Sequence, residues 1–392
     1  MKRYLEKYIL DDLKDKMVFI GGPRQVGKTT LAEQVGSNFS KTQYLNWDNR
    51  DDQKVIIGSR FKSEIELVVF DEIHKYQNWK NYIKGIYDKH KNDFSVISTG
   101  SARLNIYRKG GDSLMGRYFY YRLHPFSLAE ALGISREFES LCCNSKLLFE
   151  EDSEKFQNTL EDLFVFGGFP ETFLKKNKRT LLRWQNSRLE RLVKEDIRDL
   201  SNIRNLSLLQ IFVNIIPERV ASLFSINSVR EDLMVNFHTL ASWLDILENF
   251  YYCFRIYPYQ SSAIRSLKKE PKLYLWDYSE IKDDGARFEN LISSHLLKFV
   301  HFLYDIYGFK TDLWFLRDRD AREVDFLVTI DGNPWFAVEA KTRAKNLSKT
   351  LNYFGSRLKI PYLYQVVKEE NIDYTKDKIR VISASKFLTG LV

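Results

Sequence analysis

The residues with the clearest chemistry form a glycine-rich loop between an apolar run that ends at Ile20 and the start of a helix. Glycines in such a loop let backbone N–H groups surround phosphate oxygens. The positive end of the helix favours the same anion, and a lysine and a hydroxyl can bind the phosphates and Mg²⁺. We therefore predict that ATP and Mg²⁺ bind at Gly22, Pro23, Arg24, Gln25, Val26, Gly27, Lys28, Thr29 and Thr30, with Thr29 as a metal ligand.

Two carboxylates, Asp71 and Glu72, follow the apolar run 67–70. A run of this kind is typical of a parallel strand that is buried on both faces. Open α/β sheets bind their ligands at the C-terminal edge of such strands. We expect Asp71 to bind Mg²⁺ and Glu72 to polarise the water that attacks the γ-phosphate.

Two other positions in this region have two interpretations each. A further buried strand is predicted at 94–101, and Thr99 or Ser101 at its end either senses the γ-phosphate or caps the helix expected from about Ala102. Arg117 lies where a fifth strand begins. It either stabilises transition-state charge, at its own site or at a neighbour's, or is a surface arginine.

A second constellation lies near the C-terminus, in two strands predicted at 322–330 and 335–341 and joined by an Asp-Gly hairpin turn. Glu339 and Lys341 share one face of their strand, and Asp325 lies on the paired strand. Two carboxylates and an ammonium so placed can hold Mg²⁺, with Asp325 and Glu339 as ligands, and position a water for phosphodiester attack. The alternative is an ordinary cross-strand ion pair.

The middle of the chain is predicted to be mostly helical. A long helix from Thr180 has an apolar face that includes Leu181 and Leu182. Its basic positions Arg191, Lys194 and Arg198 are interleaved with acids, which favours a solvated surface over a phosphate-binding one. Residues 205–260 resemble a winged helix, with helices at 206–216, 227–234 and 237–248 and a strand at 251–257. The last of these helices would expose an acidic face unsuited to reading DNA, made of His238, Ser242, Asp245 and Glu248.

The composition sets broad limits on the class of protein. The chain has 392 residues, 44% hydrophobic and 29% charged, as in a soluble protein of two or three domains. There is no apolar run of about 18 residues and no export signal, so we expect a cytoplasmic protein without a membrane partner. Three cysteines without metal-site spacing fit this compartment. The net charge of +8 is only a weak indication of nucleic-acid binding.

The motifs together resemble those of a known group. Gly-Pro-Arg-Gln-Val-Gly-Lys-Thr, Phe-Asp-Glu-Ile-His-Lys, Thr-Gly-Ser-Ala, Leu-Met-Gly-Arg, His-Pro-Phe-Ser-Leu-Ala-Glu and Phe-Gly-Gly-Phe-Pro-Glu are similar to the AAA+ ATPases of bacteria and archaea. More narrowly, the chain resembles predicted ATPases joined to a restriction-endonuclease-like domain of unknown function. The resemblance implies a five-stranded core, with the strand at 94–101 between the P-loop strand and the Walker B strand. It also implies Glu289 as a helix-borne acid beside Asp325, Glu339 and Lys341.

The expected architecture is α/β and has four parts. Residues 1–132 would form an AAA+ nucleotide-binding domain with a parallel sheet, and 133–204 lid helices and a connecting helix. Residues 205–272 would form the winged-helix-like module, and 273–392 the α/β restriction-endonuclease-like domain.

Three functions remain open at this point. The first is an ATP-driven nuclease that acts on DNA, and the second is an ATPase switch whose C-terminal domain only binds a protein or nucleic-acid partner. The third is a DNA-binding ATPase that does not cut. A second copy of the chain is a further candidate partner. It would be required if Arg117 acts at a neighbour's nucleotide site.

Overall fold

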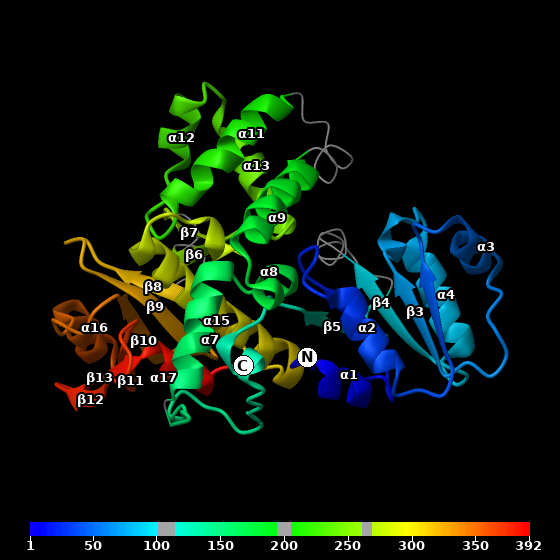
Figure 1. Cartoon of the computed structure of the whole chain (residues 1–392), viewed down its shortest axis with the longest axis horizontal. Coiled ribbons are helices and arrows are strands. Elements are labelled where there is room, and N and C mark those ends of the chain that lie inside the picture. Colours follow the sequence, from blue (N-terminus) through cyan, green and yellow to red (C-terminus); the bar gives the residue numbers. More distant parts are fainter. Residues whose placement is uncertain (101–113, 152, 194–204, 261–268) are drawn as a thin grey trace. The chain divides into compact units, whose positions relative to one another are not determined.

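The computed structural model describes residues 1–100, 114–151, 153–193, 205–260 and 269–392. The chain forms two compact units. The N-terminal unit comprises Met1–Pro125 and Asn249–Tyr251, and the C-terminal unit comprises Phe126–Glu248 and Tyr252–Val392 (Figure 1). The predictions made for Ser101, for the helix from about Ala102, and for Lys194 and Arg198 lie outside the described residues. In the described part of the chain, no helix combines the length and apolarity needed to cross a membrane.

The N-terminal unit contains a five-stranded parallel sheet in the order β2-β3-β4-β1-β5. Its strands are β1 (Met17–Gly21), β2 (Thr42–Asn46), β3 (Leu67–Asp71), β4 (Ser95–Gly100) and β5 (Tyr118–Arg122). Both β1 and β3 are buried along their whole length, as expected for apolar runs in the middle of a parallel sheet. The prediction that β4 lies between the P-loop strand and the Walker B strand is confirmed.

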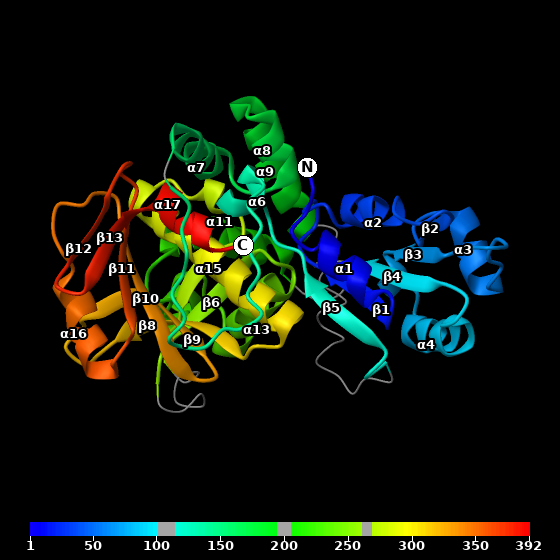
Figure 2. The same ribbon diagram turned by 90° about the horizontal axis from the view of Figure 1, so that it is seen from below.

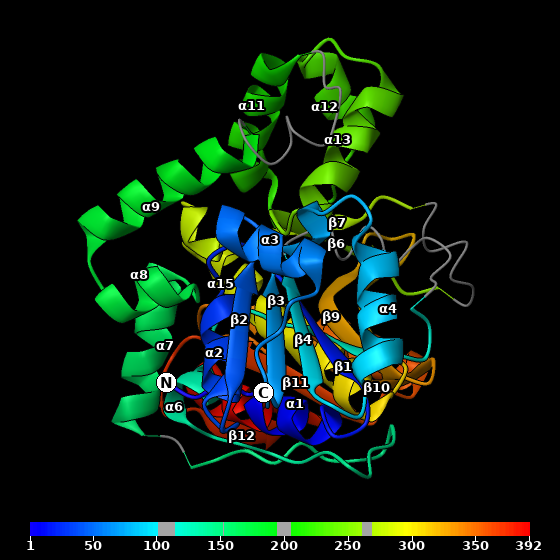
Figure 3. The same ribbon diagram turned by 90° about the vertical axis from the view of Figure 1, so that its right-hand side faces the viewer.

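Four helices cover this sheet: α1 (Glu6–Asp12), α2 (Lys28–Gly36), α3 (Arg50–Gly58) and α4 (Trp79–His90). A short 3₁₀ helix, η1 (Ile73–Lys75), follows β3. Side chains of α3 and α4 share one apolar cluster with alternate strand residues, among them Phe19 and Phe70. The helices α1 and α2 pack together, and α2 also contacts β3 and β4. Figure 2 shows α2 and α4 on opposite sides of the strands, and Figure 3 shows β2, β3, β4 and β1 side by side.

The first half of the C-terminal unit is mostly helical. Its helices are α6 (Leu128–Leu132), α7 (Glu154–Phe166), α8 (Pro170–Lys175), α9 (Lys178–Arg191), α11 (Leu206–Ile215), η3 (Ile216–Arg219), α12 (Ile226–Asp232) and α13 (Phe237–Asn249). The helices predicted at 206–216, 227–234 and 237–248 are confirmed to within one or two residues. The prediction for Leu182 is wrong, because Leu181 and Trp184 form the buried face of α9 and Leu182 is 52% exposed.

The second half is built on an eight-stranded mixed sheet in the order β12-β13-β11-β10-β9-β8-β6-β7. The strands are β6 (Cys253–Pro258), β7 (Lys272–Leu275), β8 (Thr311–Arg317), β9 (Glu323–Ile330), β10 (Asn333–Lys341), β11 (Tyr362–Val367), β12 (Asp373–Lys376) and β13 (Ile379–Ser383). Because β6 and β7 belong to this sheet, the sheet begins before residue 273 in the sequence. The predicted hairpin is confirmed, since β9 and β10 are antiparallel and Asp331 and Gly332 have φ values of 50° and 77°.

Helices lie on both faces of this sheet. They are η4 (Tyr278–Glu280), α15 (Asp284–Tyr307), α16 (Lys349–Leu358), α17 (Ala384–Phe387) and η5 (Leu388–Gly390). The long helix α15 contacts β7, β8, β9 and β10. Leu351 and Phe354 of α16 belong to a separate apolar cluster with Leu327 and Ala337. Figure 2 shows α16 and α17 on opposite sides of the strands.

Buried hydrogen bonds and an ion pair connect helix α6 and the residue before it to α15. Lys298 Nζ donates to Glu130 Oε2 at 2.6 Å and to Ser127 Oγ at 2.9 Å. The backbone N–H of Leu128 donates to His295 Nε2 at 3.0 Å. Burial lowers the pKa of His295 to about 4, so the ring is neutral at pH 7 and can accept that hydrogen bond. The polar residues of the His-Pro-Phe-Ser-Leu-Ala-Glu motif therefore hold this part of the fold together.

Candidate functional site

The P-loop has the backbone geometry that its glycines permit. Gly22 has a φ of 157°, and a Cβ there would lie 2.5 Å from the carbonyl oxygen of Leu123. Gly27 has a φ of 97° directly before α2. Lys28 Nζ donates to the carbonyl oxygens of Gly22 at 3.0 Å and Pro23 at 2.8 Å, so the lysine side chain folds back over the loop. The loop, its lysine and the start of α2 thus lie together, as predicted.

Asp71 is the centre of a hydroxyl network at the C-terminal edge of the sheet. Its Oδ2 accepts hydrogen bonds from Thr29 Oγ1 at 3.0 Å and from the Tyr44 hydroxyl, and its Oδ1 accepts one from Thr99 Oγ1. A threonine hydroxyl next to a carboxylate is the oxygen set that Mg²⁺ binds in P-loop sites, so these residues fit the predicted ion. Thr99 is therefore connected to the site through Asp71, and both interpretations of this residue stay predictions.

Sequence reasoning missed Tyr44. It lies on β2, beside β3, and burial together with the hydrogen bond to Asp71 raises its pKa. The phenol therefore stays protonated and donates to the carboxylate. The sequence shows a tyrosine at position 44, but it does not show the strand order that places this residue beside Asp71.

Glu72 directly follows β3 in the left-handed region, with a φ of 55°. Such a conformation costs free energy in a residue other than glycine, so the surrounding structure must hold Glu72 in place. The Oε2 atom is buried without a hydrogen bond, and it lies 3.5 Å from His74 Nε2 and 3.7 Å from Lys75 Nζ. Burial raises the pKa of Glu72, which makes the carboxylate a stronger base than one in water.

Arg117 lies at the N-terminal end of the strands, opposite the end at which the P-loop lies. Its carbonyl oxygen accepts from the N–H of Met17, the first residue of β1, whereas the P-loop follows the last residue of that strand. Its Nε donates to Asp88 Oδ1 at 2.8 Å. The structure therefore does not bring Arg117 to the P-loop of its own chain, and action on a neighbour's γ-phosphate stays a prediction.

We expect Arg117 to act in trans, so ATP hydrolysis per chain should rise with protein concentration. An Arg117→Ala chain mixed with a Lys28→Ala chain should recover activity that neither has alone, because each supplies what the other lacks at a shared interface. Steady-state hydrolysis over a dilution series measures both effects. Asp88→Ala is the matched control, since it removes the ion pair and keeps the arginine. A rate per chain independent of concentration, without recovery on mixing, would assign Arg117 to the surface.

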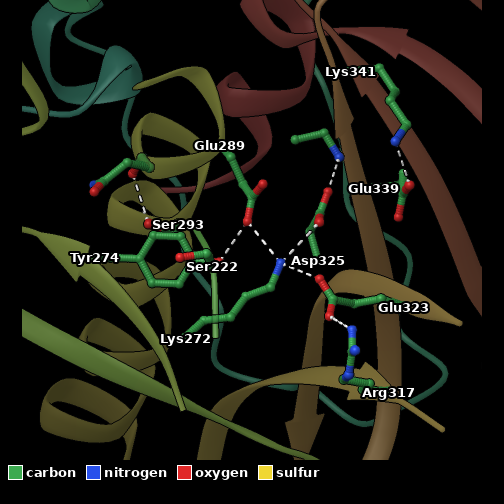
Figure 4. Close-up of polar contacts among 12 residues, drawn as sticks. Ser222, Lys272, Tyr274, Glu289, Ser293, Arg317, Glu323, Asp325, Glu339 and Lys341 are labelled. Atoms are coloured by element: carbon green, nitrogen blue, oxygen red, sulfur yellow. Dashed lines mark hydrogen bonds and ion pairs between the residues drawn. The ribbon is translucent and has the colours of Figure 1, made fainter. Parts of the chain in front are cut away.

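The second constellation also comes together. Glu289 projects from α15, Asp325 from β9, and Glu339 and Lys341 from β10 (Figure 4). Lys341 Nζ lies 2.8 Å from Glu339 Oε1, and Asp325 Oδ2 accepts from the N–H of Ala340 at 2.9 Å. Burial, followed by the negative charge of Asp325, raises the pKa of Glu339 to about 7. The same two causes raise the pKa of Glu289 to about 8.

A further lysine, which sequence reasoning missed, occupies the middle of this cluster. Lys272 Nζ lies 3.1 Å from Glu289 Oε1, 2.7 Å from Glu323 Oε1 and 3.4 Å from Asp325 Oδ1 (Figure 4). Its side chain is 2% exposed. Burial opposes its charge, but the three carboxylates together raise its pKa, so the amine stays protonated. The signal available in the sequence was a lysine opening the apolar run 272–276.

This arrangement does not fit a divalent metal ion. Mg²⁺ requires several oxygen ligands directed at one point, and the point shared by Glu289, Glu323 and Asp325 is occupied by the Lys272 ammonium. Within the described ranges, no three His, Cys, Asp or Glu residues are arranged to hold a metal ion. Of the two predicted metal ligands, Asp325 lies 3.4 Å from Lys272 Nζ, and Glu339 lies 2.8 Å from Lys341 Nζ.

Three of the four residues expected on the exposed face of α13 are exposed, and the fourth, Glu248, is half-buried. His238, Ser242 and Asp245 are exposed. Arg255 Nη2 donates to Asp245 Oδ1 at 2.6 Å and also to Glu248. This face presents carboxylates already engaged by one arginine, which remains unsuited to the phosphates beside a DNA groove.

Three stretches of the chain match known protein families. Residues 14–132 match a family described as an AAA domain. This match, together with the P-loop and the Walker pair, identifies the region as an AAA-type P-loop ATPase domain. Residues 157–279 and 284–387 match two families described as domains of unknown function, DUF8612 and DUF4143. Neither description mentions a winged helix or a restriction-endonuclease-like fold, so both of these assignments stay predictions.

The relatives that match most of the chain are distant in sequence. An uncharacterized protein of Methanocaldococcus jannaschii is 24% identical over 353 residues, with 76% of this chain and 71% of the relative covered. One of Haemophilus influenzae is 23% identical, with 83% and 82% covered. Among solved structures, a Walker-type ATPase of Pyrococcus abyssi has a TM-score of 0.40 at 13% identity, covering 69% of this chain and 92% of that one. The Holliday junction branch migration motor RuvB of Thermotoga maritima has a TM-score of 0.32 at 15% identity, covering 68% and 93%.

Proposed function

We propose that this chain, whose first domain is an AAA-type P-loop ATPase domain, uses ATP hydrolysis as a switch that acts on its C-terminal domain. The observation that carries the first half of the proposal is the network around Asp71. Hydroxyl groups from the start of α2 and from β4 both donate to this carboxylate. The presence or loss of the γ-phosphate would therefore change the contacts of α2, β3 and β4 together.

The proposed division of labour follows from the geometry. Lys28 would exchange its contacts with the carbonyl oxygens of Gly22 and Pro23 for the β- and γ-phosphates. Thr29 and Asp71 would hold Mg²⁺, which neutralises charge that develops on the phosphates when it is bound. Glu72 would accept a proton from the attacking water, because its raised pKa makes it a competent base.

For the C-terminal domain we propose a binding role, with a protein or nucleic-acid partner and without cleavage. The support is Lys272, whose ammonium already contacts Glu289 and Asp325, two of the acids that a cleaving site would offer to a metal ion. The second candidate function, Mg²⁺-dependent cleavage of DNA, is favoured by the convergence of Glu289, Asp325, Glu339 and Lys341. The two functions predict different results for plasmid DNA, because only the second would nick it.

The test is incubation of the purified full chain with supercoiled plasmid, Mg²⁺ and ATP, next to Asp325→Ala and Glu72→Gln chains. We expect ATP hydrolysis by the wild-type chain and no plasmid nicking above that of Asp325→Ala. Nicking that disappears in Asp325→Ala would instead establish the nuclease. Absence of ATP hydrolysis in the wild-type chain would contradict the first half of the proposal.

The switch itself predicts a change in the C-terminal unit that depends on the nucleotide. Backbone amides of α6 and of α15 should exchange hydrogen at different rates with ADP and with ATP held by a Glu72→Gln chain. A Lys28→Ala chain is the matched control, because it should show the same exchange with either nucleotide. Identical exchange in all nucleotide states would contradict coupling while leaving hydrolysis intact.

A further inference from the structure

We infer that the ammonium of Lys272 is the resident cation of the acidic cluster and keeps divalent metal ions out of it. This inference goes beyond the proposed switch, because it concerns the chemistry of the cluster whether or not ATP is hydrolysed. The cluster is defined as Lys272 with Glu289, Glu323 and Asp325.

The first argument is that the donors and acceptors match in number. An ammonium group has three N–H donors and no acceptor. The carboxyl groups of Glu289, Glu323 and Asp325 lie within 3.4 Å of Lys272 Nζ. The lysine therefore has one carboxylate for each donor, and no donor remains for solvent.

The second argument is that each carboxylate also has another donor. The Tyr274 hydroxyl donates to Glu289 at 2.7 Å, Arg317 Nη1 donates to Glu323 at 2.7 Å, and the N–H of Ala340 donates to Asp325 at 2.9 Å. Because each of the three carboxyl groups accepts from two donors, the cluster is a connected hydrogen-bond network that fixes the position of every member. A metal ion entering the cluster would have to replace the ammonium among them.

The third argument is that Lys272 cannot withdraw easily. Its backbone is paired with Ile256 of β6 on one side and with Leu223 on the other. The strand β7 is buried along its whole length. Moving the ammonium away would therefore require either a new side-chain path through packed residues or the displacement of β7. A divalent ion approaching the cluster with Lys272 in place would meet a like charge in a region of low dielectric constant.

Lys341 provides an internal comparison. It carries the same charge and contacts Glu339 at 2.8 Å, but its side chain is 48% exposed, against 2% for Lys272. Lys341 can leave its partner by rotating into solvent. The exclusion of metal should therefore depend on Lys272 and not on Lys341.

The test is Mn²⁺ binding by the full chain without nucleotide, followed by the loss of the free-ion signal in electron paramagnetic resonance. Four chains are compared: wild type, Lys272→Met, Lys341→Met, and Lys272→Met combined with Asp325→Asn. Methionine keeps the length of the lysine stem and removes its charge. Only binding that is lost with Asp325→Asn is assigned to the cluster, which separates it from any ion at Thr29 and Asp71.

We expect no binding that depends on Asp325 in the wild type and in Lys341→Met up to about 1 mM Mn²⁺, the weak limit for a carboxylate site. Lys272→Met should bind one ion per chain at least about tenfold more tightly than this limit. Binding by the wild type that depends on Asp325 would overturn the inference. A folded Lys272→Met chain that binds no better than the wild type would overturn it as well.

If Lys272→Met does not fold, Lys272→Gln takes its place, because the amide can still donate two hydrogen bonds to the carboxylates. The measurement is then the thermal midpoint with and without Mn²⁺. We expect a rise in Lys272→Gln that is lost when Asp325→Asn is added, and no rise in the wild type that depends on Asp325. No rise in Lys272→Gln would overturn the inference. Failure here leaves the ATPase proposal unaffected, since neither variant touches the P-loop.

Discussion

Replacing Glu72 with glutamine should slow ATP hydrolysis by about 10²- to 10⁴-fold and leave ATP binding almost unchanged. The glutamine has the size of the glutamate and fits the same left-handed position after β3, but it cannot accept a proton from water. Lys28, Thr29 and Asp71, which would hold the nucleotide and its Mg²⁺, keep their contacts. The loss therefore falls on the chemical step.

Single-turnover hydrolysis and equilibrium binding of a fluorescent ATP analogue measure the two quantities separately. Glu64→Gln is the matched control, because Glu64 is a mostly exposed glutamate of the same domain whose contact is with Lys41. This control should hydrolyse ATP at the wild-type rate. Equal turnover by Glu72→Gln and wild type would remove Glu72 from the mechanism, and loss of binding would assign it to nucleotide affinity instead.

Replacing Lys298 with methionine should lower the free energy of unfolding of the C-terminal unit by about 3–5 kcal/mol. Lys298 and Glu130 are both 2% exposed in their side chains and lie 2.6 Å apart. The substitution removes the ammonium that Glu130 contacts and keeps the carboxylate in the interior. Removing one partner of a buried ion pair is costly, because the remaining carboxylate loses the ammonium that offset part of its desolvation.

Urea unfolding, followed by tryptophan fluorescence and by hydrogen exchange of α15, measures the loss in the unit that contains the pair. Lys54→Met is the matched control, since Lys54 and Asp51 form an exposed pair that should contribute at most about 1 kcal/mol. Adding Glu130→Gln to Lys298→Met should recover part of the stability. A loss below about 1 kcal/mol for Lys298→Met would show that the interior there admits water or rearranges.

Local patterns in the sequence determined a large part of this protein. The P-loop follows from glycines, a lysine and a threonine at fixed spacing, because that spacing meets the needs of phosphate binding. The strand 67–70 and its two carboxylates follow from an unbroken apolar run. The hairpin between β9 and β10 follows from Asp331 and Gly332, whose positive φ values suit the turn. In each case the signal and the structure lie within a few residues of each other.

Only the tertiary structure decided which distant residues meet. Tyr44 reaches Asp71 from 27 residues away, and Lys298 reaches Glu130 from 168 residues away. Lys272 meets Asp325 across 53 residues, and our inference that the cluster has a cation of its own rests in part on this contact. Periodicity shows which face of a strand or helix a side chain lies on. It does not show which face it meets, because that depends on the order in which strands pair and on the face of the sheet that each helix covers.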